Sequence, residues 1–280
     1  MQDVLELVND DCAAVIDCAH GGRMASLRVF GEELLVGRRD DVLGWGCYPL
    51  APWAGRLRDR RFAFGGHCYW MPANFGTDAI HGTVFGRAWE VVAEHAIATE
   101  LGEDWPFPGR ATQGFALGPD ALEMRLRIEA LDEPFPASAG FHPWFRRRLA
   151  SGTQAELGFH AAERLLLDAN GIPTGERGPM GEGPWDDCFV GVAPDPLIRW
   201  PGVLALTLSS SHRHWVVFDE PAHALCVEPW TAPPDALNGG CAIVAPGAAL
   251  ELVMTLRWQR DDSRAAARQR AASTVTKTVV

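Results

Sequence analysis

A period-two alternation of apolar and polar residues constrains the fold of this chain more than any other feature. The segment from Leu122 to Glu129 is the cleanest example, because every second residue in it is apolar. This period matches a half-buried strand of an antiparallel sheet. The same analysis predicts further strands at 12–18, 24–30, 62–70, 87–99, 203–209, 214–218, 222–227 and 249–258. The pattern therefore predicts an all-β fold.

Glycine and proline mark the connections between these strands. His20-Gly21-Gly22 predicts the turn of an opening hairpin, whereas 74–86 and 171–183 predict longer loops. The 280 residues, of which 47% are hydrophobic, suffice for one large core. We predict a single domain over residues 1–258 and a polar tail, with a short helix, over 259–280.

Charge and cysteine content exclude several classes of protein. The net charge of -11 and the pI near 5.3 argue against a nucleic-acid-binding protein, which needs a concentrated basic surface. The seven cysteines are an odd number without a Cys-x-x-Cys pair, which favours reduced core cysteines over a disulfide framework or a zinc site. No stretch resembles a signal peptide or a membrane span, so we expect a cytoplasmic protein.

Lysine is almost absent. The one lysine is Lys277, near the end of the polar tail, and all other permanently basic side chains are arginine. Schiff-base chemistry and a phosphate-binding lysine loop are therefore excluded.

Glu228 is the candidate catalytic base. It follows the predicted strand 222–227 and precedes Pro229, which restricts Glu228 to an extended backbone and directs its carboxylate. Trp230 is placed to desolvate that carboxylate, and apolar neighbours tune a carboxylate toward acid or base work. The alternative is a solvent-exposed glutamate that ends an edge strand.

His142 is the candidate acid. It lies between Phe141 and Pro143, with Trp144 and Phe145 following, and aromatic neighbours suit the face of a sugar. The reference pKa of histidine is about 6.5, so a modest perturbation makes it an acid or a base near neutral pH. The alternative is a packed core histidine.

Two loops supply candidate ligand-binding residues. Arg56 follows Gly55 in a proline-stiffened segment, and its guanidinium fork suits ligand oxygens. His81 precedes Gly82, which lets the backbone turn sharply and uncovers the imidazole. Solvated surface side chains are the alternative for both.

Two further pairs of polar residues need separate interpretations. Adjacent Asp186 and Asp187 cannot both face the same way on an extended chain, so one binds ligand hydroxyls while the other caps a turn, or both are ordinary loop aspartates. His212 and His214 share a strand face, but the spacing suggests no third metal ligand. We predict no metal site and no cofactor.

Five motifs in order resemble the aldose 1-epimerase (galactose mutarotase) family. They are Pro52 to Phe64 with its Gly55-Arg56-Leu57-Arg58-Asp59 centre, His81-Gly82, Phe141-His142-Pro143-Trp144-Phe145, Asp186-Asp187-Cys188-Phe189, and Glu228-Pro229 with Pro233-Pro234-Asp235-Ala236-Leu237-Asn238. The resemblance extends up to Trp258 and implies a large antiparallel β-sandwich of the galactose mutarotase type.

The resemblance also implies residue roles. Glu228 matches the general base, His142 the general acid, and Arg56, His81 and Asp186 the sugar-binding positions. The implied reaction opens the sugar ring and closes it as the other anomer. Family members commonly carry asparagine before the arginine, where this chain has Gly55, so a hydroxyl contact is lost.

Three alternatives remain at this stage. A glycoside hydrolase would use Glu228 and Asp186 as a carboxylate pair, and a sugar-sensing or carbohydrate-binding protein would use the same fold without turnover. Within the epimerase hypothesis, an anionic hexose remains open because arginines crowd the loops; the candidates are Arg56, Arg58, Arg146 and Arg147. The sequence makes no prediction of oligomeric state, and the expected partner is a small sugar.

Overall fold

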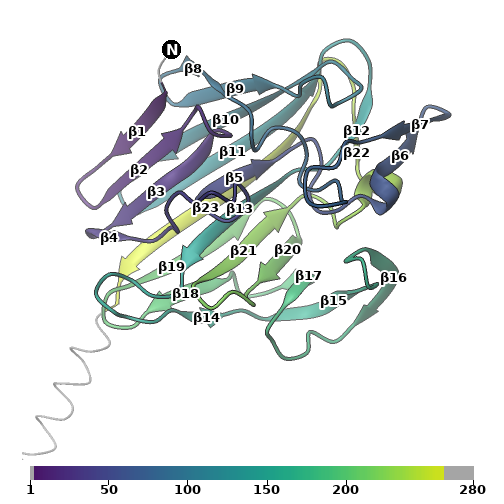
Figure 1. Cartoon of the computed structure of the whole chain (residues 1–280). Helices are drawn as coiled ribbons and strands as arrows, with labels where there is room; N and C mark the ends of the chain where they lie inside the picture. The colour runs from purple at the N-terminus through teal and green to yellow at the C-terminus, as the bar shows by residue number, and fades with distance from the viewer. Residues whose placement is uncertain (1–2, 262–280) are drawn as a thin grey trace, which may run out of the picture.

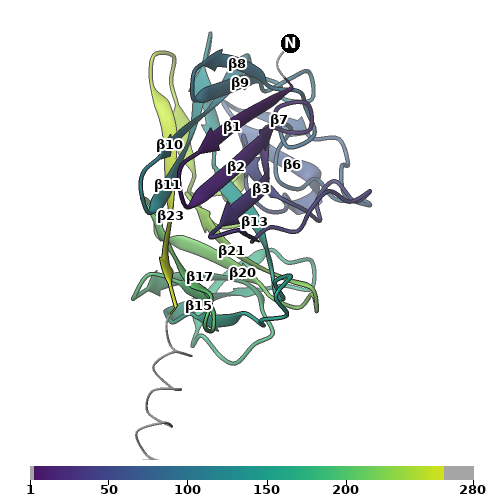
Figure 2. The same cartoon turned by 90° about the vertical axis from the view of Figure 1, so that its left-hand side faces the viewer.

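The computed structural model describes residues 3–261, which form two β-sheets stacked face to face (Figures 1 and 2). Every ladder between the strands is antiparallel. The prediction of an antiparallel β-sandwich is confirmed.

The larger sheet contains the strands that form the floor of the candidate site. In spatial order its strands are β1 (Val4–Val8), β2 (Cys12–Asp17), β3 (Arg23–Val29), β5 (Cys47–Leu50), β13 (Gly140–Arg146), β21 (Ala224–Trp230), β20 (His214–Phe218), β17 (Asp186–Val192), β15 (Ala161–Leu167) and β16 (Pro173–Gly178), with β4 (Glu32–Glu33) paired to β3.

The second sheet covers one face of the first. Its order is β14 (Glu156–Gly158), β18 (Leu197–Trp200), β19 (Leu204–Ser210), β23 (Ala249–Arg260), β11 (Ala121–Ala130), β10 (Gly109–Leu117), β9 (Ala96–Glu100) and β8 (Glu90–Ala93). Two small pairs complete the fold, β12 (Phe135–Ala137) with β22 (Ala242–Val244) and β6 (Arg61–Phe64) with β7 (His67–Trp70), together with two 3-10 turns, Arg58–Arg60 and Ala236–Asn238.

Strand β11 confirms the period-two prediction. Its residues alternate between partly exposed and buried along the whole strand. Leu126 is fully buried and pairs with Leu252 of β23, so the apolar face of both strands enters the core between the sheets. The alternation thus arises because one face of the strand is exposed to solvent and the other is buried.

Two predicted strands are hairpins, and one predicted loop contains a strand. Segment 62–70 reverses at Gly65-Gly66 between β6 and β7, and both glycines have positive φ. Segment 87–99 divides in the same way into β8 and β9. Within 171–183, strand β16 pairs with β15. Backbone groups can pair whatever the polarity of the side chains, so the polar composition did not reveal this strand. The first strand, β1, was not predicted.

Strands β13 and β21 are buried on both faces because they lie in the middle of the larger sheet. Phe141 and Val227 pack into the core between the sheets. Trp144 and Trp230 on the opposite face belong to a second apolar cluster. A strand covered on both sides reads as a nearly continuous apolar run, so a charged group there requires a partner.

Two findings concern the remainder of the chain. No helix within residues 3–261 is long and apolar enough to cross a membrane. Strand β23 continues through Arg260, two residues beyond the predicted domain boundary, and the predicted tail helix lies outside the described residues.

Leu126→Ala tests the interpretation of β11. We expect the free energy of unfolding to fall by about 2–5 kcal/mol, because the change leaves a cavity between the sheets. Glu129→Ala on the wet face of the same strand is the control and should change it by less than about 0.5 kcal/mol. Denaturant unfolding measures both. Equal losses would contradict the assignment of the two faces.

Candidate active site

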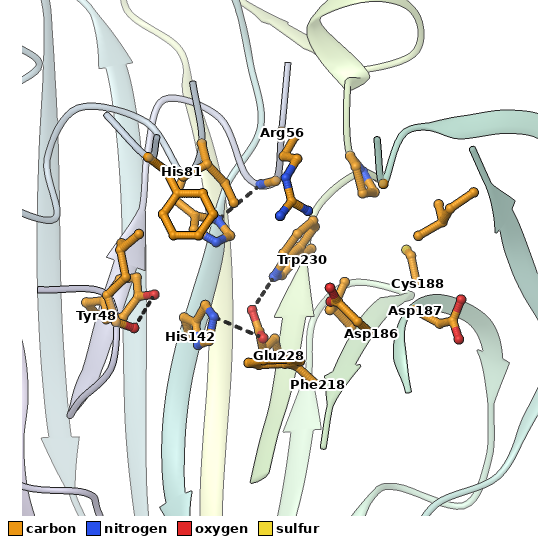
Figure 3. A pocket seen from close by; sticks show the side chains of 18 of the residues that line it. Tyr48, Arg56, His81, His142, Asp186, Asp187, Cys188, Phe218, Glu228 and Trp230 are labelled. Atoms are coloured by element: carbon orange, nitrogen blue, oxygen red, sulfur yellow. Dashed lines mark hydrogen bonds and ion pairs between the residues drawn. The ribbon is translucent and has the colours of Figure 1, made fainter. Parts of the chain in front are cut away.

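A cavity of about 260 Å³ lies on the face of the larger sheet that points away from the second sheet (Figure 3). Its floor is formed by β13, β21, β20 and β17, and loops from the first third of the chain close one side. The lining includes all five sequence-predicted site residues: Arg56, His81, His142, Asp186 and Glu228.

Glu228 lies within strand β21, and the strand continues through Trp230. The expectation that Glu228 ends the strand is therefore wrong, as is the alternative of an exposed edge-strand glutamate, because its exposed fraction is 1%. Pro229 is tolerated in a central strand because the ladder to β13 skips these positions; the pairs on either side are Gly140 with Trp230 and Trp144 with Cys226. By this register, His142 faces Glu228.

The carboxylate of Glu228 has two polar contacts. His142 Nε2 lies 3.3 Å from Oε1, and the Trp230 indole N–H donates to Oε2 at 3.2 Å. Burial is the main reason why the pKa of Glu228 lies well above its usual value; the nearby charge of Asp186 raises it further, whereas the Trp230 hydrogen bond opposes the shift. The sequence prediction of a desolvated carboxylate beside Trp230 matches this geometry.

The imidazole of His142 is fixed between two aromatic rings. Its centroid lies 4.9 Å from that of Tyr48 and 5.4 Å from that of Trp144, and both rings are stacked on it. Burial lowers the pKa of His142 well below 6.5, and nearby positive charge on Arg23 adds to the effect. The ring is held with Nε2 toward Glu228, while Nδ1 has no hydrogen-bond partner within the described residues.

His81 is positioned by two loops that bond to each other. The Gly55 N–H donates to His81 Nδ1 at 3.2 Å, and the His81 N–H donates to the Gly55 carbonyl at 3.1 Å. His81 has a φ of 61°, and Gly82 follows with a φ of 84° where an added Cβ would meet the Ala51 carbonyl oxygen. Burial lowers the pKa of His81 to about 3. A neutral His81 that accepts at Nδ1 carries its proton on Nε2 and is a hydrogen-bond donor.

Arg56 sits at the cavity wall, half-buried. Its Nε lies 3.4 Å from Asp78 Oδ2, and its guanidinium lies 5.9 Å from the ring centroid of Phe75. These contacts orient the fork while leaving donors for a ligand.

Asp186 and Asp187 begin strand β17 and have different environments. Asp187 pairs with Arg164 at 3.3 Å, whereas the side chain of Asp186 has no hydrogen bond or ion pair within residues 3–261 and lies beside Glu228 (Figure 3). Burial raises the pKa of Asp186, and Arg56 opposes the shift. Asp186 is thus the carboxylate of the two with free acceptor capacity.

Gly55, which precedes Arg56, lies where there is little room for a side chain. It has a φ of 77°, and an added Cβ would lie 2.9 Å from the Trp230 ring and 3.0 Å from Pro234. The Trp230 ring fills the space that an amide side chain would need. The indole that contacts Glu228 therefore also packs on the loop that supports Arg56.

Three residues in or under this site were not singled out from the sequence. Tyr48 stacks on His142, and Cys226 lies below Glu228 on the same strand face. Arg23 is fully buried, donates to the carbonyls of His20, Val42, Trp45 and Phe85, and lies over the Tyr48 ring. Only the tertiary fold brings these residues together, so no local pattern reveals them.

Within the described residues, one group of three side chains has the composition of a metal site. The ligating atoms of His142, Cys226 and Glu228 lie within 4.8 Å of one another. Two of these atoms, His142 Nε2 and Glu228 Oε1, are 3.3 Å apart, close enough for a proton to pass directly between the two side chains.

Comparison with known proteins identifies the family. The aldose 1-epimerase family model matches residues 3–257. The chain belongs to the aldose 1-epimerase family. The resemblance seen in the sequence is thereby confirmed.

Several individual proteins are similar to this aldose epimerase family member. The uncharacterized protein YphB of Escherichia coli K12 is 28% identical over 124 residues, a match that spans 42% of this chain and 43% of YphB. A galactose mutarotase-like protein from Clostridium acetobutylicum superposes with a TM-score of 0.80 at 16% identity, covering 91% of this chain and 94% of that one. A GalM/aldose epimerase homologue from C. elegans gives 0.76 at 16%, covering 92% and 98%. At these identities the two structures establish a shared fold.

Gly55→Ala tests the packing of the Trp230 ring on the Arg56 loop. We expect the free energy of unfolding to fall by more than about 1 kcal/mol, because the methyl group meets Trp230 at a positive φ. Gly65→Ala is the control, since Gly65 also has a positive φ but no heavy atom within 4 Å of the added Cβ. Thermal unfolding compares them. A loss no larger than that of Gly65→Ala would contradict the close packing.

Proposed function

We propose that this protein is an aldose 1-epimerase that interconverts the α and β anomers of a neutral aldose by acid–base ring opening and closure. The observation that carries the proposal is the buried contact between His142 Nε2 and Glu228 Oε1 on the cavity floor. Anomer exchange requires a base for the anomeric hydroxyl and an acid for the ring oxygen, and it requires both within reach of one bound sugar.

The mechanism follows from a single proton held by the Glu228–His142 pair. In the reactive form, reached when a sugar binds, the shared proton has moved from Glu228 to His142, which leaves a carboxylate beside an imidazolium. Glu228 takes the proton of the anomeric hydroxyl while the imidazolium gives its Nε2 proton to the ring oxygen and becomes a neutral imidazole. The C1–O5 bond breaks, the free aldehyde rotates about C1–C2, and reclosure on the other carbonyl face reverses both transfers. The neutral His81 donates to a sugar hydroxyl, Arg56 also donates, and Asp186 accepts.

A neutral sugar fits the charges of the cavity better than an anionic one. The lining contains Arg56 but also Asp41, Asp186, Asp187 and Glu228. The other arginines considered as anion ligands are engaged elsewhere: Arg58 pairs with Asp168, Arg146 donates to the Leu35 carbonyl, and Arg147 donates to the Pro221 carbonyl. Like charge would repel a phosphate or sulfonate.

The alternatives have weaker support. A glycoside hydrolase needs a second carboxylate acting with Glu228, whereas the direct polar partners of Glu228 are His142 and Trp230. A sugar sensor needs the donors and acceptors of the cavity but has no use for a buried acid–base pair. We also propose that the chain has a cytoplasmic location and a single domain, the latter because residues of both sheets pack in one core.

Glu228→Gln should lower the rate of anomer exchange at least 100-fold, because glutamine cannot take up the hydroxyl proton. NMR magnetisation transfer between α and β signals, across a panel of neutral aldoses and hexose phosphates, measures this rate. Glu123→Gln is the control, since Glu123 lies on the partly exposed face of β11 in the second sheet and is not among the residues that line the cavity. Exchange by Glu228→Gln at the wild-type rate would remove Glu228 from the mechanism. Binding without exchange by the wild-type protein would favour the sensor.

Trp230→Phe tests how the pair is tuned. The raised pKa of Glu228 and the lowered pKa of His142 widen the pH range in which the pair holds one proton. The Trp230 N–H stabilises the carboxylate and lowers its pKa, so its removal should raise that pKa and move the alkaline limb of kcat/KM to higher pH. Trp70→Phe, at an exposed residue, should leave the limb in place. A shift to lower pH would contradict the assignment.

A further inference from the structure

We propose that His142, Cys226 and Glu228 form a binding site for a thiophilic divalent cation such as Zn²⁺, and that the cation inhibits the enzyme. The ligating atoms of these side chains lie within 4.8 Å of one another, and all three residues are buried. The inhibition depends on the proposed function, whereas the binding itself does not.

The ligand types match a zinc site with an open position. Zn²⁺ takes sulfur, imidazole nitrogen and carboxylate oxygen at about 2.0–2.3 Å, and sites with three protein ligands leave a fourth position for water or another ligand. Tetrahedral bonds of that length separate the ligand atoms by roughly 3.5 Å. The Nε2–Oε1 distance of 3.3 Å is already in this range. The sulfur needs only a small side-chain shift to join them.

The backbone presents the three ligands on one face. Cys226 and Glu228 are separated by one residue on β21, so both side chains point away from the second sheet. His142 faces them from β13, and stacking between Tyr48 and Trp144 holds its ring. The Trp230 N–H occupies Oε2 and leaves Oε1 toward the imidazole. Such outer contacts orient ligands before a metal arrives.

The charge of the cavity favours entry of a cation. Asp41, Asp186 and Asp187 line the same cavity, against a single lining arginine, Arg56. A cation reaching the floor meets the carboxylate and imidazole, which line the cavity, before the fully buried sulfur of Cys226. Its fourth position then faces the cavity. When it binds, the thiol proton and the proton shared by the pair leave to solvent.

Coordination and proton transfer use the same atoms. A metal on Nε2 and the carboxylate occupies the lone pairs that exchange protons with the sugar. It also takes the position where the anomeric hydroxyl would contact Glu228, so the cation and the productively bound sugar exclude each other. We therefore expect Zn²⁺ to inhibit anomer exchange competitively, with added sugar protecting the enzyme.

Cd²⁺ and Zn²⁺ titrations of the full chain test the site. Cd²⁺ bound to a thiolate gives an ultraviolet charge-transfer band, which reports coordination without any assay of activity. We expect the band to be complete at one equivalent of Cd²⁺. Cys226→Ser should abolish the band and weaken Zn²⁺ binding tenfold or more. Cys68→Ser is the control because Cys68 is an exposed free cysteine. Binding at His212 and His214 would give no such band, because histidine has no thiolate.

Two results would overturn the proposal: a band that survives Cys226→Ser, or no one-to-one binding to the wild-type protein. Cys226→Ala with an unchanged unfolding transition serves if the serine variant misfolds. Failure of the metal site and failure of the epimerase are distinguishable. A Cys226-dependent band without exchange of any sugar leaves the site intact and removes the epimerase. Anomer exchange that Zn²⁺ does not inhibit, with no Cd²⁺ band, removes the metal site and leaves the epimerase proposal intact.

Discussion

The contact between His142 and Glu228 across two neighbouring central strands is the interaction on which the site depends. An unpaired carboxylate on a strand buried on both faces would be costly, and the imidazole and the Trp230 indole compensate for that burial. Because burial penalises both charged forms, the pair shares one proton near neutral pH instead of behaving as two independent surface groups. Strand register, aromatic packing and the covering loops all maintain this pairing.

The loops supply what the strands cannot. Two hydrogen bonds position His81 beside the cavity: the Gly55 N–H donates to the imidazole Nδ1, and the His81 N–H donates to the Gly55 carbonyl. The same turn carries Arg56. Trp230 contacts both the loops and the strands, since its ring packs on Gly55 while its N–H donates to Glu228. Glycine at position 55 leaves room for this large ring, so the indole packs on the loop while its N–H contacts the carboxylate.

Sequence reasoning predicted the strands whose faces differ, such as β11, because period-two alternation records one wet face and one packed face. It merged the hairpins at Gly65 and between β8 and β9, because a tight reversal interrupts the apolar pattern only briefly. Motifs in order predicted the candidate residues, including Glu228 and His142. Their mutual contact, the stacking of Tyr48 and the buried Arg23 depend on strand order in the sheet, which no local pattern contains.

A direct measurement of the protonation state of His142 tests this account. Imidazole ¹⁵N shifts followed by NMR report the charge of the ring as the pH falls. We predict that His142 stays neutral through its reference pKa of about 6.5 and that Glu228→Gln changes its nitrogen shifts. A ring that titrates at or above that value, with shifts unaffected by Glu228→Gln, would contradict a buried pair sharing one proton.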